Sequence, residues 1–318
     1  MRHALAVVSS LSVFLLGLAG PVFAHGLAGK RFFPSTIAIE DPFVSDELTL
    51  PNITHIKRRA SGDEPAARET SFSGEYSKRI TPNFGLSLEG TLVHVDPDHG
   101  EVLDGFENLE VGLKYQAFTS AAHEAIVSLG LSWEVGGTGR RATGAESFDV
   151  VTPAVLFGKG FGDLPDSLSA LKPLALTGVV GLAIPTRAKT RTVKVEGDEV
   201  EVEVEKNPNV VTWGFAIEYS LPYLTSYVRD YGLPDFVRRL IPLVEIELQT
   251  PIDRGQGGRT TGTVNPGVIW AGKFFQVGVE AVVPINERTG KNVGIRGMLH
   301  FFLDDLFPNS IGRPLLGR

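Results

Sequence analysis

The stretch GFENLEVGLKYQAF, residues 105–118, decides the fold class of this sequence. From Asn108 to Ala117 polar and apolar residues alternate without interruption, with Leu, Val, Leu, Tyr and Ala at the odd positions. An alternation of period two over about ten residues is typical of a β-strand with one apolar and one polar face. The apolar face must lie against either a protein core or lipid.

The same alternation recurs along the 318-residue chain. It is clearest at 123–136, 211–221 and 275–285, where aromatic residues lie toward the segment ends. With weaker cases included, the pattern predicts about twelve strands. Their expected ranges are 48–58, 68–80, 83–95, 106–118, 123–136, 147–160, 173–187, 208–221, 240–252, 261–272, 274–286 and 291–303.

The connections between these strands fall into two kinds. Those after the odd-numbered strands are polar and rich in glycine and charge, such as DPDHGEVLDG and RGQGGRTTG. Those after the even-numbered strands are tight, such as TPN and GKF, or longer and amphipathic, with helix starts expected at Asp166 and Thr225. Short turns on the periplasmic side and longer polar loops outside are the pattern of an outer-membrane β-barrel. We therefore expect an all-β, transmembrane antiparallel barrel with short periplasmic helical turns.

A soluble periplasmic β-domain is the alternative. Such a domain would have strands of about five or six residues packed face to face. The strands expected here run to ten residues or more, and about nine to eleven are needed to cross the hydrocarbon at a tilt. The length favours lipid against the apolar faces. Pro153 and Pro266 oppose this interpretation, because proline within a strand removes a ladder hydrogen bond unless a bulge intervenes.

The chain ends suggest four regions. Residues 1–24 have the basic start, apolar run and small residues of a secretory signal peptide. Residues 25–46 are too few for a domain, but their apolar residues favour packing, so they form a candidate plug of the barrel. The barrel is expected over 47–304, followed by a C-terminal periplasmic tail at 305–318. Residues 194–206 alternate valine with glutamate, which fits a projecting hairpin or a solvated loop.

Composition excludes several classes of function. The chain has no cysteine, which removes disulfides and thiolate sites. Its net charge of −7 opposes nucleic-acid binding. No GxSxG motif is present and His300 has no serine tied to it by a motif, so we expect no enzyme, no cofactor and no metal site.

The polar strand faces carry the candidate site. Eight glutamates lie there against few basic residues, and rings of acidic side chains in a pore favour cations. Paired charges that only satisfy a polar interior are the alternative. Glu245 and Glu247 lie two residues apart on one face, but no third ligand suggests a metal. The expected lumen-lining residues are Glu89, Glu110, Lys114, Glu134, Glu218, Glu245, Glu247, Glu280 and Arg296.

Several segments resemble one family. SKRITPNFGLSLEG, GFENLEVGLKYQ, LQTPIDRG, NPGVIWAGKFFQVGVEAVVPIN and LHFFLDDLFPNSIGRP are similar to proteobacterial outer-membrane proteins of the meta-pathway phenol-degradation-like family of transporters. The resemblance covers most of the chain after residue 27. It implies a twelve-stranded barrel in the Gram-negative cell outer membrane, and passage of small solutes that include aromatic molecules. It brings no ligand residue with it. Many such barrels end on an aromatic residue, whereas here LDDLFPNSIGRPLLGR follows Phe301 and Phe302.

The sequence thus predicts a porin-like passive channel or transporter for small solutes, including small aromatic or hydrophobic molecules. Its expected partners are outer-membrane lipid, the solute, and the barrel-assembly machinery during biogenesis. A structural or interaction barrel with an occluded lumen remains an alternative, because the apolar residues of 25–46 favour an occupied interior. The identity of the solute is not encoded in any motif.

Overall fold

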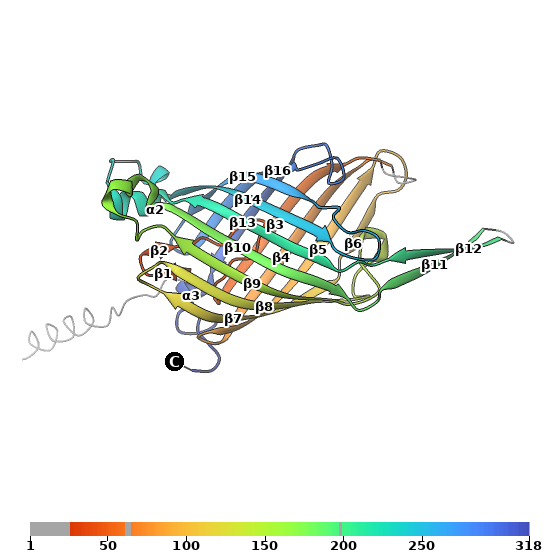
Figure 1. Cartoon of the computed structure of the whole chain (residues 1–318), viewed down its shortest axis with the longest axis horizontal. Coiled ribbons are helices and arrows are strands. Elements are labelled where there is room, and N and C mark those ends of the chain that lie inside the picture. The colour runs from red at the N-terminus through yellow and green to blue at the C-terminus, as the bar shows by residue number, and fades with distance from the viewer. Residues whose placement is uncertain (1–25, 61–64, 197–198, 318) are drawn as a thin grey trace, which may run out of the picture.

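A computed structural model describes residues 26–60, 65–196 and 199–317. The predicted signal peptide, residues 1–24, lies outside these ranges. The described chain forms a closed antiparallel β-barrel (Figure 1). Its wall has twelve strand positions, here called staves, of which one is shared by two strands, β6 and β7. The staves are β3 (Glu47–Arg58), β4 (Ala67–Thr81), β5 (Phe84–Pro97), β6 (Leu103–Phe106) with β7 (Leu109–Ser120), β8 (Ala125–Val135), β9 (Val150–Gly160), β10 (Leu174–Pro185), β13 (Val210–Tyr219), β14 (Leu240–Pro251), β15 (Thr261–Ala271), β16 (Phe275–Pro284) and β17 (Gly294–Phe302).

Each stave pairs with its neighbours along the chain, and the last pairs with the first. β17 and β3 align Ile295 with His55 and Phe302 with Glu47, which closes the sheet. Closure removes the two free edges that an open sheet of these strands would have, as a lipid environment requires. The predicted fold class and strand number are therefore confirmed.

The stretch at 105–118 is interrupted, which the alternation did not predict. β6 ends at Phe106 and β7 begins at Leu109, although both lie along β5. Between them Asn108 is buried, and its side-chain amide donates to Glu134 Oε1 (2.9 Å) and accepts from Gly139 N (3.0 Å). These hydrogen bonds favour a local break, because asparagine competes with the backbone ladder for partners.

Both interior prolines are accommodated without a bulge. Pro153 pairs with Leu131 of β8, while the β9–β10 pairing stops at Ala154 and resumes at Val151 in the same register. Pro266 pairs with Val244 of β14, and the β15–β16 pairing has a similar gap beside it. A missing ladder bond on one side alone is thus enough to admit each proline.

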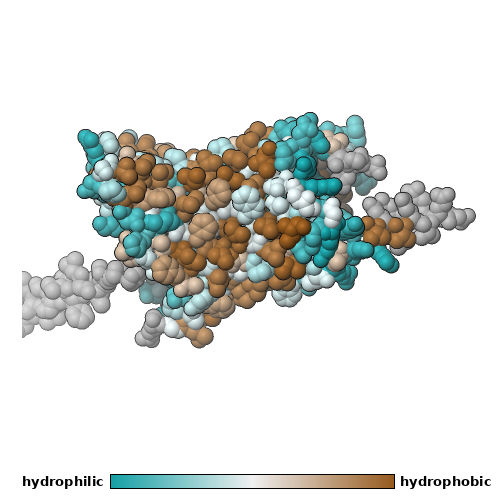
Figure 2. All heavy atoms as spheres, viewed as in Figure 1, coloured by the Kyte–Doolittle hydropathy of each residue, from teal (hydrophilic) through white to brown (hydrophobic). Residues whose placement is uncertain are grey.

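The outer wall of the barrel is apolar. Leu88, Leu129, Val180 and Ile217 point outward and are each about half exposed. Figure 2 shows apolar residues over the middle of the wall and hydrophilic ones toward both ends. A closed barrel with an apolar band outside and carboxylates inside is the architecture of an outer-membrane protein, not of a soluble β-domain. The chain is thus an outer-membrane β-barrel. The described helices are short, and none has the length and apolarity to cross a membrane.

The two ends of the barrel differ (Figure 1). At one, here called the hairpin end, β11 (Lys189–Glu196) and β12 (Glu199–Lys206) pair as a ribbon that projects beyond the wall. The other, the termini end, carries the N-terminal segment and the tail. It also holds β1 (Leu27–Ala28), β2 (Arg31–Phe32), η2 (Asp166–Leu171), α2 (Leu221–Tyr223), η3 (Leu224–Val228), η4 (Val237–Arg239) and α3 (Leu303–Leu306). One further turn, η1 (Arg141–Thr143), lies in the β8–β9 loop.

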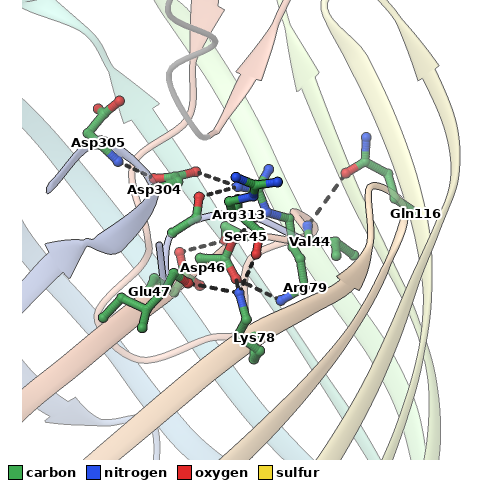
Figure 3. Close-up of polar contacts among 12 residues, drawn as sticks. Val44, Ser45, Asp46, Glu47, Lys78, Arg79, Gln116, Asp304, Asp305 and Arg313 are labelled. Carbon is green, nitrogen blue, oxygen red and sulfur yellow. Dashed lines mark hydrogen bonds and ion pairs between the residues drawn. The ribbon is translucent and has the colours of Figure 1, made fainter. Parts of the chain in front are cut away.

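The C-terminal tail folds back onto the wall (Figure 3). Buried Asp46 accepts from Lys78 Nζ (2.6 Å) and from Arg79 Nε (2.7 Å). Lys78 Nζ also donates to the carbonyl of Arg313 (2.7 Å), and Leu316 N donates to the backbone of β4 (2.7 Å). Asp46 therefore joins the entry to β3 to the end of β4, and Lys78 joins that strand end to the tail. The periplasmic location of the tail stays a prediction.

Candidate functional site

The N-terminal segment, residues 26–46, lies inside the barrel in the half nearer the termini end. Its apolar residues pack on the wall in two clusters. Ile37 contacts Ile241, Ile269 and other buried residues, and Phe33 packs against Phe43 and Ile126. At Gly29 the segment comes close to the β7–β8 turn. The φ of +65° there and the nearby carbonyl of Ala121 leave no space for a side chain.

One buried carboxylate holds the middle of this segment. Glu245 Oε2 accepts from Ile37 N (3.0 Å), and Glu245 Oε1 accepts from Ala38 N (3.1 Å) and Ile39 N (3.2 Å). Three successive backbone N–H groups thus converge on one side chain, as in an anion-binding nest. Such charge-assisted hydrogen bonds are stronger than neutral ones. Glu245 is therefore an anchor for the segment and not a free wall charge.

Further polar contacts from the wall follow the segment along its length. Gln276 Nε2 donates to the carbonyl of Ser35 (2.5 Å), and Asn52 Nδ2 donates to the carbonyl of Ile37 (3.0 Å). Lys114 Nζ donates to the carbonyl of Asp41 (2.7 Å). The irregular backbone of the segment thus finds partners inside the barrel, as buried peptide groups must.

An ion pair locks the segment at the termini end. Arg31 is fully buried, and its Nε lies 3.2 Å from Glu124 Oε2 of the β7–β8 turn. Its Nη1 donates to the carbonyl of Pro173 (3.0 Å), and its guanidinium lies 3.8 Å from the ring centre of Tyr223. Tyr223 Oη donates to Glu124 Oε1 (2.8 Å). The segment is thereby joined to three separate connections of the barrel.

Tyr223 and Arg31 of this lock keep their protons at neutral pH. Burial, followed by the hydrogen bond to Glu124, raises the pKa of Tyr223 to about 12, so the phenol remains a donor. Burial lowers the pKa of Arg31 while Glu124 opposes the shift, and guanidinium groups remain protonated in proteins. The lock is thus a buried ion pair with the Tyr223 ring against its guanidinium.

A cavity of about 420 Å³ lies above the segment, toward the hairpin end. Residues 36–40 form its floor, and its walls carry many hydroxyl and carboxyl groups. A second cavity of about 330 Å³ shares Glu247 and Gln249 with it and extends to Thr261 and Arg288 near the hairpin-end loops. The polar lining of the first includes Thr49, Ser73, Glu75, Ser87, Glu89, Glu110, Ser132, Thr152, Thr212, Glu247 and Gln249, together with Glu40 of the floor.

Four glutamates form a ladder on one wall of this space. Glu75 of β4 pairs with Glu89 of β5, Glu89 pairs with Glu110 of β7, and Glu110 pairs with Glu134 of β8. Directly opposite residues of an antiparallel pair have Cβ atoms about 5 Å apart, and like charges there are destabilising. Lys114 is the nearest base on these strands, and it pairs with Glu40 (2.9 Å). The ladder therefore concentrates carboxyl groups on one wall of the lumen.

On the opposite wall, a basic side chain lies beside two of the carboxylates. Arg296 Nη1 lies 3.0 Å from Glu280 Oε1, and its Nη2 lies 3.6 Å from Glu247 Oε2. Glu280 and Glu218 are buried below the cavity, and Glu218 Oε1 accepts from Thr177 Oγ1 at 3.5 Å. Of the nine predicted lumen residues, the structure thus places Glu89, Glu110 and Glu247 at the cavity, Lys114 and Arg296 in ion pairs beside it, Glu134 at the end of the ladder, and Glu218, Glu245 and Glu280 in buried positions.

His300 has partners that no sequence motif predicted. Its Nε2 lies 3.1 Å from Ser35 Oγ and 3.4 Å from Glu47 Oε2, and its Nδ1 lies 2.9 Å from Thr49 Oγ1. In a hydrolase triad the acid orients the ring through the nitrogen that does not face the serine. Here serine and acid share one nitrogen, and the ring is 1% exposed. The arrangement is that of a packing contact, while the absence of enzyme activity stays a prediction.

The lumen offers no evident metal site. In the described part of the chain, no set of three or more His, Asp or Glu side chains is placed to hold a metal ion.

Sequence reasoning missed the residues that the segment contributes. Glu40, Arg31 and Asp41 lie before the first wall strand, where no alternation marks them, and Glu124 lies in a turn. The five charged residues among the apolar ones of 26–46 are a signal that could have suggested buried pairing.

Comparison with known proteins finds similar barrels. No family model and no curated protein matches the sequence. Among solved structures, the chain is similar to the KdgM porin at 13% identity, covering 80% of this chain and 98% of that one with a TM-score of 0.44. For the NanC porin the values are 12%, 80%, 98% and 0.44. For an outer membrane channel from Pseudomonas putida F1 they are 12%, 85%, 99% and 0.48.

At these identities the likeness is one of barrel architecture, and it assigns no solute to this chain. The resemblance to the phenol-degradation-like family is supported only at the level of the barrel. The family itself stays a prediction.

Proposed function

We propose that this barrel is a passive outer-membrane channel for small polar solutes and that its acidic wall favours cations. The observation that carries this proposal is the ladder of Glu75, Glu89, Glu110 and Glu134 beside the cavity. Neighbouring carboxylates repel one another, so mobile cations that enter the lumen are stabilised there. Rings of acidic side chains select cations in pores for the same reason.

The lining also bears on the kind of solute. Five carboxylates border the cavity, from Glu40, Glu75, Glu89, Glu110 and Glu247, and no lysine or arginine does among the described residues. Hydroxyl groups fill much of the remaining wall. Apolar solutes prefer pockets lined mainly by hydrophobic and aromatic side chains. The lining therefore supports polar cationic solutes over the aromatic or hydrophobic ones that the family resemblance implies.

The test is planar-bilayer conductance of the mature chain in a salt gradient, read as the reversal potential. Glu89→Gln with Glu110→Gln should lower the cation preference several-fold, because two adjacent charges leave the wall. Glu101→Gln with Glu287→Gln is the matched control, since it removes the same charge from exposed loop positions. Cation selectivity that is unchanged in the first variant, or lost equally in the control, would contradict the proposal.

A barrel with a closed lumen is the second candidate, and the N-terminal segment inside the barrel favours it. Protein that is folded and inserted but electrically silent would support closure by this segment. Under that outcome the role of a plug for residues 26–46, which is also a proposal, would account for the absence of current.

A further inference from the structure

The outer wall at the termini end carries a compact group of aromatic side chains. The aromatic rim, as we name it, consists of Phe236, Trp270, Phe274 and Phe275. The rings of Phe236 and Trp270 stack with centroids 6.3 Å apart and an interplanar angle of 22°, and Phe275 lies 5.5 Å from Trp270. The neighbours of Trp270 in β15, Ile269 and Ala271, are buried on the lumen side, so the indole faces outward. The β13–β14 connection thus folds back over the outside of the barrel.

Two cations lie on this rim. The guanidinium of Arg239 is 5.8 Å from the ring centre of Trp270, and Lys273 Nζ is 4.8 Å from that of Phe274. They come from adjacent strand ends, because Leu240 pairs with Trp270 in the sheet. Within the described ranges, no carboxylate lies at ion-pair distance from either one. Cation–π contacts at exposed sites contribute only about 0.5–1 kcal/mol and leave the positive charge available to an anion.

Three cations at the hairpin end, on β3, on β4 and in the β16–β17 loop, are arranged differently. Arg58 lies beside Glu69, Arg68 lies 3.4 Å from Asp96, and Lys291 lies 3.0 Å from Glu287. The protein supplies an acid for each of these bases. The rim of the termini end supplies rings instead and, for Arg239, the carbonyl of Ala271 (3.5 Å), but no acid among the described residues, which points to an anion from outside the chain.

The position of the rim identifies that anion. Phe236 is 64% exposed, and Phe275 continues into outward Val277 and the apolar wall. Aromatic side chains at the membrane boundary sit at headgroup level, and each basic residue near an anionic lipid surface contributes about 1 kcal/mol. We propose that the aromatic rim, with Arg239 and Lys273, binds an anionic phospholipid, whose phosphate lies between the two cations and whose acyl chain follows Phe275.

This inference is independent of what passes through the lumen. It also implies that the termini end faces the leaflet that contains phospholipid, which agrees with the predicted periplasmic location of the C-terminal tail. A protein partner would instead require a surface clear of the hydrocarbon boundary, whereas these rings are continuous with the lipid-facing wall.

The experiment measures the lipids retained by the folded barrel. The mature protein is reconstituted with equal amounts of phosphatidylcholine and phosphatidylglycerol, stripped to its tightly held lipids, and analysed by native mass spectrometry. We expect enrichment of phosphatidylglycerol on the order of tenfold, because two basic residues face the headgroup. Arg239→Gln with Lys273→Gln should abolish it. Arg58→Gln with Arg68→Gln, which removes the same charge at the hairpin end, should leave it intact.

Phe236→Ala distinguishes the contribution of the aromatic ring to lipid binding from that of the two cations, which it leaves in place. It should reduce the number of retained lipids while the remaining ones still favour phosphatidylglycerol. The proposal is overturned if the wild-type barrel shows no preference, or if both double variants lose it equally, since net charge alone would then explain the result. Heat-modifiable migration on gels confirms that each variant is folded before its lipids are counted.

Discussion

Glu245 and Glu247 are two residues apart on the same face of β14, yet they occupy different environments. Glu245 is fully buried and accepts three backbone N–H groups of the N-terminal segment. The Glu247 side chain is 39% exposed, borders the cavity and lies 3.6 Å from Arg296. One half of the lumen is therefore a packed core and the other a wet acidic space.

The difference shows that a lumen-facing carboxylate has no fixed role. Where the segment supplies N–H groups or Arg31, the carboxylate stabilises a closed interior. Where it supplies none, as along the ladder from Glu75 to Glu134, the carboxylates lie opposite one another on neighbouring strands and repel one another. The boundary between these roles is set by where the segment stops.

The largest expected effect comes from the lock at the termini end. Arg31→Gln leaves Glu124 buried without its cation, and breaking a buried pair by removing one partner costs about 3–5 kcal/mol. We expect a loss of that order in the free energy of unfolding from urea titration, together with cleavage of the segment by added protease.

Arg58→Gln at the hairpin end is the matched change. The side chains of Arg58 and Glu69 are 50% and 21% exposed, and exposed pairs contribute at most about 1 kcal/mol. Equal losses in the two variants would mean that the termini end is not a packed core.

An intermediate effect is expected from Glu245→Gln. The amide has one acceptor oxygen and presents its NH₂ group to donors, so the segment should lose about 2 kcal/mol of anchoring. Conductance should rise as the segment leaves the lumen more often. Glu247→Gln removes the same charge two residues away and should leave the segment in place while lowering cation preference. The comparison between the halves fails if the two variants exchange these phenotypes or cannot be distinguished.

The smallest expected effect comes from the ladder. Glu89→Gln removes like-charge contacts with both Glu75 and Glu110, so the barrel should become more stable by about 1 kcal/mol at low salt. The gain should shrink as salt screens the wall. Unfolding titrations at two ionic strengths, with Glu101→Gln as control, would measure this. A destabilised Glu89→Gln variant would show that the ladder is held by hydrogen bonds that outweigh repulsion.

Much of the fold was predictable from local patterns. The alternation placed all twelve staves to within about three residues, since a strand that separates lipid from water must alternate. The break at Asn108 was not predictable, because it depends on Glu134 and Gly139, which are distant in sequence. The folding back of the tail was not predictable either, because the sequence shows only that LDDLFPNSIGRPLLGR follows Phe302. The dependence on barrel-assembly machinery stays a prediction.

The sequence by itself determined that this chain is a closed barrel with an apolar exterior and an acidic interior, because those properties follow from the period of the strand and the identity of its residues. Only the tertiary structure decided which acids are anchors and which are wall charges. That assignment depends on cross-strand register and on the path of the N-terminal segment. Both bring together residues with no relation in sequence, such as Glu245 with Ile37, and Glu75 with Glu89.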